Sequence, residues 1–339
     1  MAAPGTVRAL LRRALAALLL FAVLAFPLVF VRPFPRHVMI MIFLYGALAT
    51  AWNILAGYCG QISLGHAVFF GIGAYTSTLL GRELGLTPWL GMVAGAALAV
   101  IVSQAIGYPV FRLRGHYFAI ATIGVGEIVQ TSVLNWDLVG AARGLFVPIK
   151  RPDSLLNFQF HESKAVYYYI ALGLLALALA VTRSIERSRR GYYFRAIKED
   201  QDAAASLGVR VARQKQAAMA VSAALTALGG TFWAQYVLFI DPESVFPLSL
   251  SILICLVAVL GGVGSLWGPL LGAAVLVPLS EGTRVLLGGT GKALDLLIYG
   301  ALIMVIAVFQ PAGLMGLVRQ LGSRRAAVAG AGVRRESAA

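Results

Sequence analysis

The chain has 339 residues, of which 59% are hydrophobic and only 12% are charged. A soluble domain carries about twice that charged fraction, and this sequence repeats apolar runs of about 20 residues, the length that crosses a bilayer as a helix. The composition excludes an ordinary soluble globular protein. It predicts an all-α polytopic membrane protein with about ten transmembrane helices, some of them broken or re-entrant.

The charge is strongly positive, because 28 Lys and Arg against 14 Asp and Glu give a formal net charge of +14. Most of the excess lies beside apolar runs, where Lys and Arg set membrane topology and meet anionic lipid headgroups. No module that combines aromatic and basic residues accompanies it, so we expect no nucleic-acid partner. The two cysteines, Cys59 and Cys255, lie in or beside apolar runs, which predicts neither a disulfide framework nor a metal site.

Ten apolar runs, each ended by charge, glycine or proline, are candidate membrane helices. The first follows Arg8, Arg12 and Arg13, a layout that is also typical of a signal peptide. Because the run is about 18 residues long and no small-residue cleavage site is clear, we expect an uncleaved first helix. The ten runs are 14–31, 38–56, 62–81, 88–107, 116–134, 165–183, 216–239, 248–263, 265–281 and 293–310.

The main basic clusters agree on one topology, with Arg32 and Arg36, which it places outside, as exceptions. If the N-terminal arginines are cytoplasmic, alternation places the hydrophilic segment 184–215 in the cytoplasm and returns the C-terminus there,. This arrangement needs two short helices with a glycine-rich break in the stretch 248–281; one long tilted helix is the alternative. We therefore expect one membrane domain over residues 1–318 and a basic cytoplasmic tail over residues 319–339.

The long hydrophilic segment between the sixth and seventh runs, residues 183–215, contains nine Lys or Arg and four Asp or Glu. Within it, Asp200 is placed as the N-cap and Gly208 as the left-handed stop of a helix over Gln201–Leu207. A helix of about two turns is too short to be stable alone in water. We expect a partner protein at the membrane face to hold it; a solvated or headgroup-bound loop is the alternative.

Glycines recur within the runs. Gly264, Gly268 and Gly272 repeat every four residues, a spacing that predicts one flat helix face and close backbone contact between helices in lipid. Tight helix packing is the first interpretation. The second is that residues 57–81 and 261–272 are broken or re-entrant segments that line a path near the membrane midplane.

Polar side chains inside membrane helices are costly and are therefore candidates for function. Glu127 is the single carboxylate well inside a predicted span, and Gln130 and Thr131 share its helix face,. Hydrogen bonding between helices is one interpretation; the polar lining of a path for a zwitterionic or amide-bearing solute is another. The candidate path residues are Gln61, Ser63, His66 and Tyr75 on the third run and Thr122, Glu127, Gln130 and Thr131 on the fifth.

The segment Gly288–Ala293 is a near miss to a phosphate loop. The pattern requires glycine at the position of Leu286 and Ser or Thr at that of Ala293, so we expect no nucleotide site in this chain. The four histidines lack metal-ligand spacing,, and the sequence has no nucleophile elbow. We therefore expect neither a resident cofactor nor an enzyme activity.

Several long motifs, in one order along the chain, resemble a known family, the LivM-type permeases of branched-chain amino acid ABC importers. The likeness runs from about Ala51 to Leu317. Two segments depart from the family's usual pattern, Val139–Leu145 and the ending Gln310–Gly313. The matching motifs are Gly57–Tyr75 (GYCGQISLGHAVFFGIGAY), Gly115–Val129 (GHYFAIATIGVGEIV), Arg195–Gly208 (RAIKEDQDAAASLG) and Gly261–Ala273 (GGVGSLWGPLLGA).

The resemblance implies a half-transporter in the bacterial inner membrane. Such a subunit pairs with a second, homologous permease, docks two ATP-binding subunits beneath it and receives solute from a periplasmic solute-binding protein. The segment 195–208 resembles the family's coupling loop, which inserts into a cleft on the ATPase. The implied coupling residues are Arg195, Lys198, Glu199 and Asp200, which fix the orientation of the loop, and Ala203, Ala204, Ala205 and Leu207, an apolar ridge that Gly208 ends.

The leading hypothesis from the resemblance is an inward permease for branched-chain amino acids or related small polar solutes, with ATP hydrolysis on separate subunits. Relatives in this family also move urea and short amides. A proton-coupled secondary transporter, with Glu127 as the coupling acid, is a competing interpretation. An intramembrane enzyme that uses His66 and Glu127 as acid and base is a third.

Overall fold

The computed structural model describes most of the membrane domain. The expected tenth span at 293–310 and the basic tail at 319–339 lie outside the described residues, as do the near-miss phosphate loop and the N-terminal arginines. Of the first expected run, residues 21–29 are helical. The described residues are 21–30, 32–149, 156–160, 163–286 and 313–317, with the single residues 14, 18, 154 and 300.

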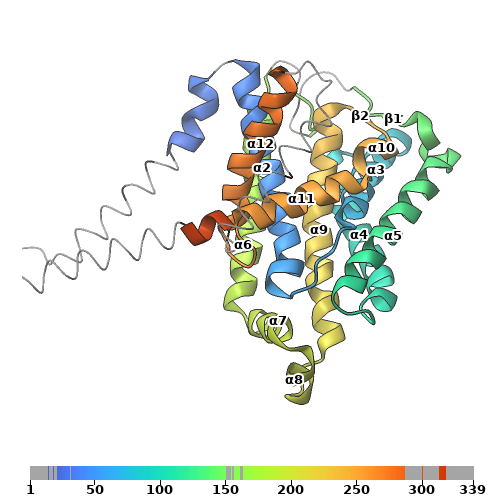
Figure 1. Cartoon of the computed structure of the whole chain (residues 1–339). Helices are drawn as coiled ribbons and strands as arrows, with labels where there is room; N and C mark the ends of the chain where they lie inside the picture. Colours follow the sequence, from blue (N-terminus) through green and yellow to red (C-terminus); the bar gives the residue numbers. More distant parts are fainter. Residues whose placement is uncertain are drawn as a thin grey trace, which may run out of the picture.

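The described chain is a bundle of helices with one very small sheet (Figure 1). The long helices are α2 (Pro33–Asn53), α3 (His66–Glu83), α4 (Pro88–Val110), α5 (His116–Leu134), α6 (Ala165–Arg187), α9 (Val211–Val237), α11 (Leu248–Gly261) and α12 (Gly268–Leu286). The shorter elements are the π-helix η1 (Ile54–Tyr58), the 3₁₀ turns η2 (Asp137–Val139) and η3 (Ala141–Arg143), the helices α7 (Arg189–Glu199), α8 (Gln201–Ser206) and α10 (Pro242–Val245), and the strands β1 (Leu145–Phe146) and β2 (Phe239–Ile240).

The prediction of an all-α membrane protein is confirmed. Among the described residues, six helices are long and apolar enough to cross a membrane. The expected break within 248–281 is also confirmed, because α11 ends at Gly261 and α12 begins at Gly268. The six candidate spans are Pro33–Tyr58, Pro88–Val110, His116–Leu134, Ala165–Arg187, Val211–Val237 and Pro242–Gly261.

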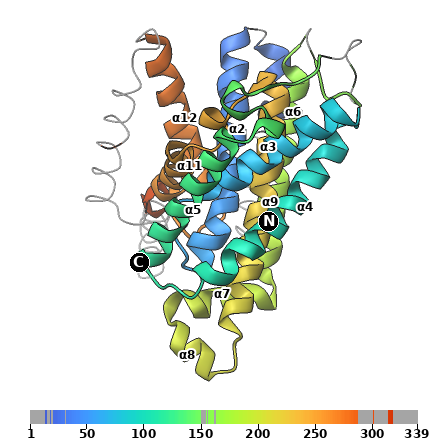
Figure 2. The same ribbon diagram turned by 90° about the vertical axis from the view of Figure 1, so that its right-hand side faces the viewer.

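Helix α9 forms the centre of the bundle, with α3 and α4 on one side and α2 on the other (Figures 1 and 2). Glycine makes the contact of α9 with α3 very close, since a methyl group at Gly230 would overlap the carbonyl group of Phe70. At the same crossing, Thr231 Oγ1 donates a hydrogen bond of 2.9 Å to the carbonyl oxygen of Gly73. Lipid tails are as apolar as the helix surfaces, so the hydrophobic effect does not drive helices together in a bilayer. Close packing at small residues and hydrogen bonds of this kind do so instead.

The sequence predicted one helix face formed by Gly264, Gly268 and Gly272, but the structure places two of these glycines, Gly268 and Gly272, on α12. Gly268 and Gly272 pack against the backbone of α11 and of the loop after it, where any side chain would overlap carbonyl groups. Gly264, however, precedes α12 and has a φ of +78°. It lies in the loop 262–267 between the two helices, so its spacing in the sequence does not continue into one helix face.

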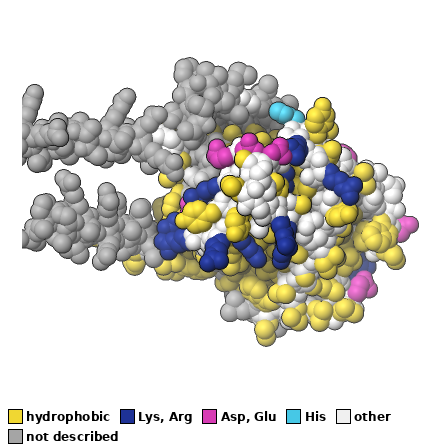
Figure 3. Space-filling model, turned by 90° about the horizontal axis from the view of Figure 1, so that it is seen from below, with side chains coloured by type: hydrophobic (Ala, Val, Ile, Leu, Met, Phe, Trp, Pro, Cys, Tyr) yellow, Lys and Arg dark blue, Asp and Glu magenta, His cyan; other side chains and the backbone are white. Residues whose placement is uncertain are grey.

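The two ends of the bundle differ in structure. At one end, β1 and β2 pair antiparallel, with Leu145 opposite Ile240, and this pairing ties the segment after α5 to the end of α9. The departing motif Val139–Leu145 lies at this end. At the other end, α7 and α8 project from the bundle (Figure 1). Seen from below, this second end shows many Lys and Arg side chains around a smaller acidic group (Figure 3).

The hydrophilic segment contains more helix than the sequence predicted. Helix α6 continues to Arg187, and α7 fills the region that the sequence left without structure. Phe194 and Ile197 of α7 are each 1% exposed and pack into a hydrophobic cluster with η1 and α9. Two apolar residues three apart are a weak pattern within many arginines, which is why sequence periodicity did not reveal this helix.

Candidate functional site

Helix α8 has the two termini that its sequence predicted. The Asp200 carboxylate accepts hydrogen bonds from the backbone amides of Asp202 (2.8 Å) and Ala203 (3.0 Å). Gly208 follows the helix with a φ of +85°, a conformation that favours glycine. The bonds from Ala203 and Asp202 lower the pKa of the Asp200 carboxyl group. Its capping contribution is therefore complete above the usual pKa of aspartate and is lost only as pH falls through the lowered value.

The apolar residues of this helix point in two directions. Ala204 is buried against the rest of the chain, whereas Ala203 and Ala205 are exposed. Leu207 is 85% exposed at the tip of the projection. The predicted ridge is thus divided: Ala204 attaches α8 to its own bundle, and Leu207 leaves a large apolar side chain free for another surface.

Two cations hold α8 in place. The Arg114 guanidinium, from the turn between α4 and α5, makes a bidentate pair with Asp202 at 2.9 and 3.0 Å. Lys215 on α9 is almost fully buried, and its Nζ donates a 2.8 Å hydrogen bond to Gln201 Oε1. Neither contact could be predicted from the sequence, because no local pattern relates position 114 to 202 or position 215 to 201. The helix is consequently positioned from two sides of the bundle.

The end of α2 is broken and meets the loop 262–267. Asn53, fully buried in the last turn of α2, donates through Nδ2 to the carbonyl oxygen of Ser265 (2.9 Å) and accepts through Oδ1 from the amide of Gly264 (2.8 Å). One side-chain amide thus binds a donor and an acceptor of the loop backbone. We call the contact between η1 and the loop 262–267, held by Asn53, the joint.

The last turn of α7 rests on this joint. Gly60 has a φ of +74°, and a Cβ placed on it would lie 3.1 Å from Lys198 Cα. A Cβ on Gly264 would lie 3.3 Å from Lys198 Nζ and 3.1 Å from the carbonyl oxygen of Gly57. Lys198 is two residues before the cap of α8, so a short stretch of chain connects α8 to the joint.

The non-helical stretch 61–65 is anchored by side chains of its neighbours. Trp52 Nε1 donates to the carbonyl oxygen of Ser63 (2.7 Å), and the amide of Leu64 donates to Thr122 Oγ1 (3.0 Å). Gln61 and Ser63 are themselves buried. Irregular backbone at membrane depth is tolerated where it is buried in protein and hydrogen-bonded. Within the region 57–81 the helices are thus interrupted between η1 and α3, and α3 itself is continuous.

His66 is fully buried between α3 and α9. Ser222 gives its own proton to the carbonyl oxygen of Ala51 (2.7 Å), so Ser222 Oγ accepts from His66 Nε2 at 2.8 Å. His66 Nδ1 then accepts from Ser63 Oγ at 3.2 Å. A neutral imidazole therefore has a hydrogen-bond partner at each of its two ring nitrogens. This arrangement is a link between helices, and the side chain is 0% exposed.

The comparisons with known proteins identify the family. Residues 35–307 match the family model described as branched-chain amino acid transport system / permease component. The chain belongs to this family. It is 32% identical over 298 residues to the high-affinity branched-chain amino acid transport system permease protein LivM of Escherichia coli (strain K12), with 81% of this chain and 68% of the relative covered.

Two further relatives cover more of their own length. The permease is 27% identical over 296 residues to the high-affinity branched-chain amino acid transport system permease protein LivH of Escherichia coli (strain K12), covering 80% of this chain and 91% of the relative. It is 29% identical over 292 residues to the corresponding protein BraD of Pseudomonas aeruginosa, with coverage of 80% and 91%. No solved structure matches the chain.

The predicted path residues of the permease separate into two groups. Gln61, Ser63, His66 and Thr122 lie together around the start of α3, and Tyr75 is buried further along the same helix. Glu127 and Thr131 are exposed on α5, and Gln130 is half-buried there. Glu127 lines a narrow cleft with Leu64, Gly65, Phe246 and Ser251.

Helix α5 is the least covered long helix of the permease in the described region. Phe118 and Thr122 are its buried residues, while Tyr117, Ile120 and Ile128 are each more than three-fifths exposed. The helix lies at one side of the bundle, in front in Figure 2, with α6 on the opposite side (Figures 1 and 2). A carboxylate on such a face does not fit contact with lipid tails, so this face needs water or protein against it.

Proposed function

We propose that this chain is the transmembrane permease subunit of an ATP-binding-cassette importer. It moves branched-chain amino acids, or related small polar solutes, inward across the bacterial inner membrane, while separate subunits hydrolyse ATP. The family and the names of its relatives support the solute class. The observation that carries the mechanism is the projecting α8, which is fixed to its own bundle by Asp202 and Gln201 and presents Leu207 outward.

The proposed topology places α7 and α8 in the cytoplasm. The Lys and Arg side chains at this end (Figure 3) support that orientation, because basic residues favour the cytoplasmic side,. Ten membrane helices over residues 1–318 and a basic tail over 319–339 then place both termini in the cytoplasm. The pairing of β1 with β2 lies at the periplasmic end, where the solute-binding protein docks.

The proposed path runs along the exposed face of α5. A second, homologous permease subunit covers this face, so that Glu127, Gln130 and Thr131 line a polar route between the two subunits. Their exposure on a helix of membrane-spanning length supports this assignment,. The buried group around His66 keeps the broken start of α3 in position beside the route.

Coupling follows the contacts of α8. One of the two ATP-binding subunits grips Leu207, Ala203 and Ala205 of α8. Arg195, Lys198 and Glu199 on α7 orient α8. Movement of α8 passes through Lys198 to the joint, where η1 and the loop 262–267 meet. Because α3 and α11, the helices next to these two segments, contact α5, a shift at the joint changes access to the path.

A proton-coupled carrier is the second candidate, and the exposed position of Glu127 favours it. The two functions differ in their requirements. We expect vesicles that contain this chain, a homologous permease, two ATP-binding subunits and the solute-binding protein to accumulate leucine only with ATP. Leucine accumulation by this chain alone under an imposed pH gradient would contradict the importer function. In that case Glu127→Gln is expected to abolish the accumulation.

Parallel assays with urea and a short amide identify the solute class.

A further inference from the structure

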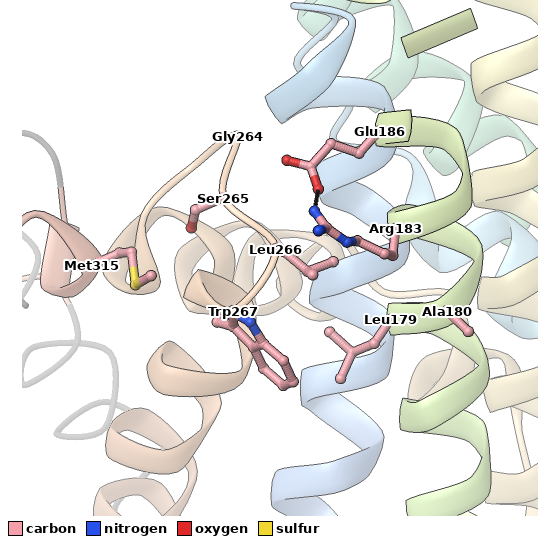
Figure 4. Close-up of a pocket in the computed structure, with 9 residues that line it drawn as sticks. All are labelled: Leu179, Ala180, Arg183, Glu186, Gly264, Ser265, Leu266, Trp267 and Met315. Atoms are coloured by element: carbon pink, nitrogen blue, oxygen red, sulfur yellow. Dashed lines mark hydrogen bonds and ion pairs between the residues drawn. The ribbon is translucent and has the colours of Figure 1, made fainter. Parts of the chain in front are cut away.

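An open groove lies beside the joint, between the last turns of α6 and the loop 262–267 (Figure 4). It encloses about 510 Å³. Leu179, Ala180 and Arg183 form the wall from α6, and Leu266 and Trp267 form the facing wall. In Figure 4 the Trp267 ring and the Leu179 side chain face the space from opposite sides. The transport path along α5 uses none of these residues.

The groove closes toward the middle of the membrane. There α6 and α12 approach each other over Gly46 of α2, since a Cβ on Gly46 would lie 3.4 Å from Leu175 Cδ1 and 3.6 Å from Leu270 Cδ1. Leu175 is one turn before Leu179 on α6, so the apolar wall continues from the closed end to the mouth. Arg183 lies one further turn along, toward the charged end of α6. The groove is therefore apolar inside and cationic at its mouth.

The charge at the mouth is predominantly positive. Arg183 Nη1 is 2.7 Å from Glu186 Oε2, and Arg195 Nη2 is 3.8 Å from Glu186 Oε1. Glu186 thus serves two arginines. One carboxylate between two guanidinium groups leaves hydrogen-bond donors on Arg183, whose side chain is 47% exposed.

We propose that this groove binds an anionic phospholipid of the inner leaflet, with the phosphate on Arg183 and an acyl chain against Leu179, Leu266 and Trp267. A guanidinium group suits a phosphate because its planar donors reach two oxygens at once. Basic pockets between helices at the cytoplasmic surface have the chemistry that anionic headgroups need. Tryptophan, with an apolar ring and an N–H donor, is suited to the membrane interface.

The position of the groove supports lipid as its occupant. Helix α6 lies on the opposite side of the bundle from α5, the side left to lipid when a second permease covers α5 (Figures 1 and 2). Gly264 and Ser265, which Asn53 binds, also line the groove. A bound lipid therefore touches the loop of the joint. The inference rests on the proposed function for the leaflet and for the side of the bundle that faces lipid.

The test measures lipid contact without transport. The full-length chain is reconstituted in phosphatidylcholine vesicles with increasing mole fractions of dibrominated phosphatidylglycerol, because bromine quenches indole fluorescence at contact range. The Trp267 contribution is the difference between the wild type and Trp267→Phe. We expect half-quenching of Trp267 at a mole fraction about fivefold lower than with dibrominated phosphatidylcholine, because both lipids carry a phosphate but the choline cation of phosphatidylcholine is repelled by the arginines.

Three variants and one matched control make the test specific. Arg183→Gln is expected to remove the preference for phosphatidylglycerol, and Arg183→Lys to keep part of it. Glu186→Gln should lower the half-quenching mole fraction by about threefold, because it releases donors of Arg183. Arg112→Gln is the matched control, since it removes an exposed cation from the same end of the molecule, in the turn after α4 and next to Tyr108.

Four results would overturn the proposal. The first is equal quenching by the two brominated lipids. The second is an equal loss of preference in Arg183→Gln and Arg112→Gln, which would indicate general surface charge. Displacement of the lipid by millimolar inorganic phosphate would indicate a site for free anions. Loss of quenching when the ATP-binding subunits are added would assign the groove to a protein interface. A failure of ATP-driven uptake leaves the lipid measurement unaffected, so the two proposals can fail separately.

Discussion

Replacing Asn53 by leucine is expected to destabilise the permease and to abolish ATP-driven uptake. Leucine has the branching of asparagine but no donor or acceptor, so it leaves the half-buried amide of Gly264 and the buried carbonyl group of Ser265 without their partner. Each unsatisfied buried polar group costs about 1 to 3 kcal/mol, so we expect a loss of about 2 to 6 kcal/mol in the free energy of unfolding. The measurement is the thermal midpoint of the purified chain, followed by intrinsic fluorescence, together with leucine uptake in vesicles.

Thr50→Val is the matched control for Asn53. Thr50 is equally buried, one turn earlier on α2, and its hydroxyl group bonds to the carbonyl oxygen of Gly46 within the same helix. Its replacement removes one local hydrogen bond, worth about 1 kcal/mol, and leaves the joint intact. If Thr50→Val reduced stability and uptake as strongly as Asn53→Leu, the joint would have no special role.

The second large effect is expected at Leu207, without any loss of stability. Leu207 is 85% exposed, so Leu207→Glu should leave the thermal midpoint of the isolated chain unchanged. If an ATP-binding subunit holds this side chain in a cleft, the new carboxylate must be buried in that cleft, which costs binding free energy. We expect leucine uptake to fall at least tenfold, which corresponds to a loss of about 1.4 kcal/mol in the free energy that couples the two subunits. We also expect that solute no longer stimulates ATP hydrolysis.

A control for Leu207 comes from the opposite end of the molecule. Leu84 is 66% exposed just after α3, and Leu84→Glu makes the same chemical change away from the proposed ATPase interface. We expect Leu84→Glu to retain uptake. Normal uptake and normal ATPase stimulation in Leu207→Glu would show that α8 is not the contact with the motor.

The sequence predicted the parts of the fold that depend on local patterns. The apolar runs marked most helices to within a few residues, as with α5, whose predicted and observed bounds are both 116–134. Asp200 and Gly208 predicted the two ends of α8, because a cap and a left-handed stop act within one turn. The glycines at 261–264 predicted the break before α12 for the same local reason.

Long-range contacts were beyond the reach of sequence patterns. Asn53 and Gly264 are 211 positions apart, and neither looks unusual in its own segment. The same limit applies to Arg114 with Asp202 and to Lys215 with Gln201. Burial also separated residues that the sequence had grouped: His66 is buried and hydrogen-bonded to two serines, whereas Glu127 is exposed on α5. The packing of α3 against α9 buries His66, and the sparse covering of α5 leaves Glu127 exposed.

The most direct test of the account is the accessibility of α8. A cysteine is introduced by Leu207→Cys, with the unmodified chain as background for Cys59 and Cys255, and is labelled with a membrane-impermeant maleimide. We predict labelling in inside-out vesicles, no labelling from the periplasmic side of intact cells, and protection when the ATP-binding subunits are added. Labelling of Leu207→Cys from the periplasmic side would contradict the cytoplasmic position of α8. Labelling that the ATP-binding subunits leave unchanged would contradict their contact with α8.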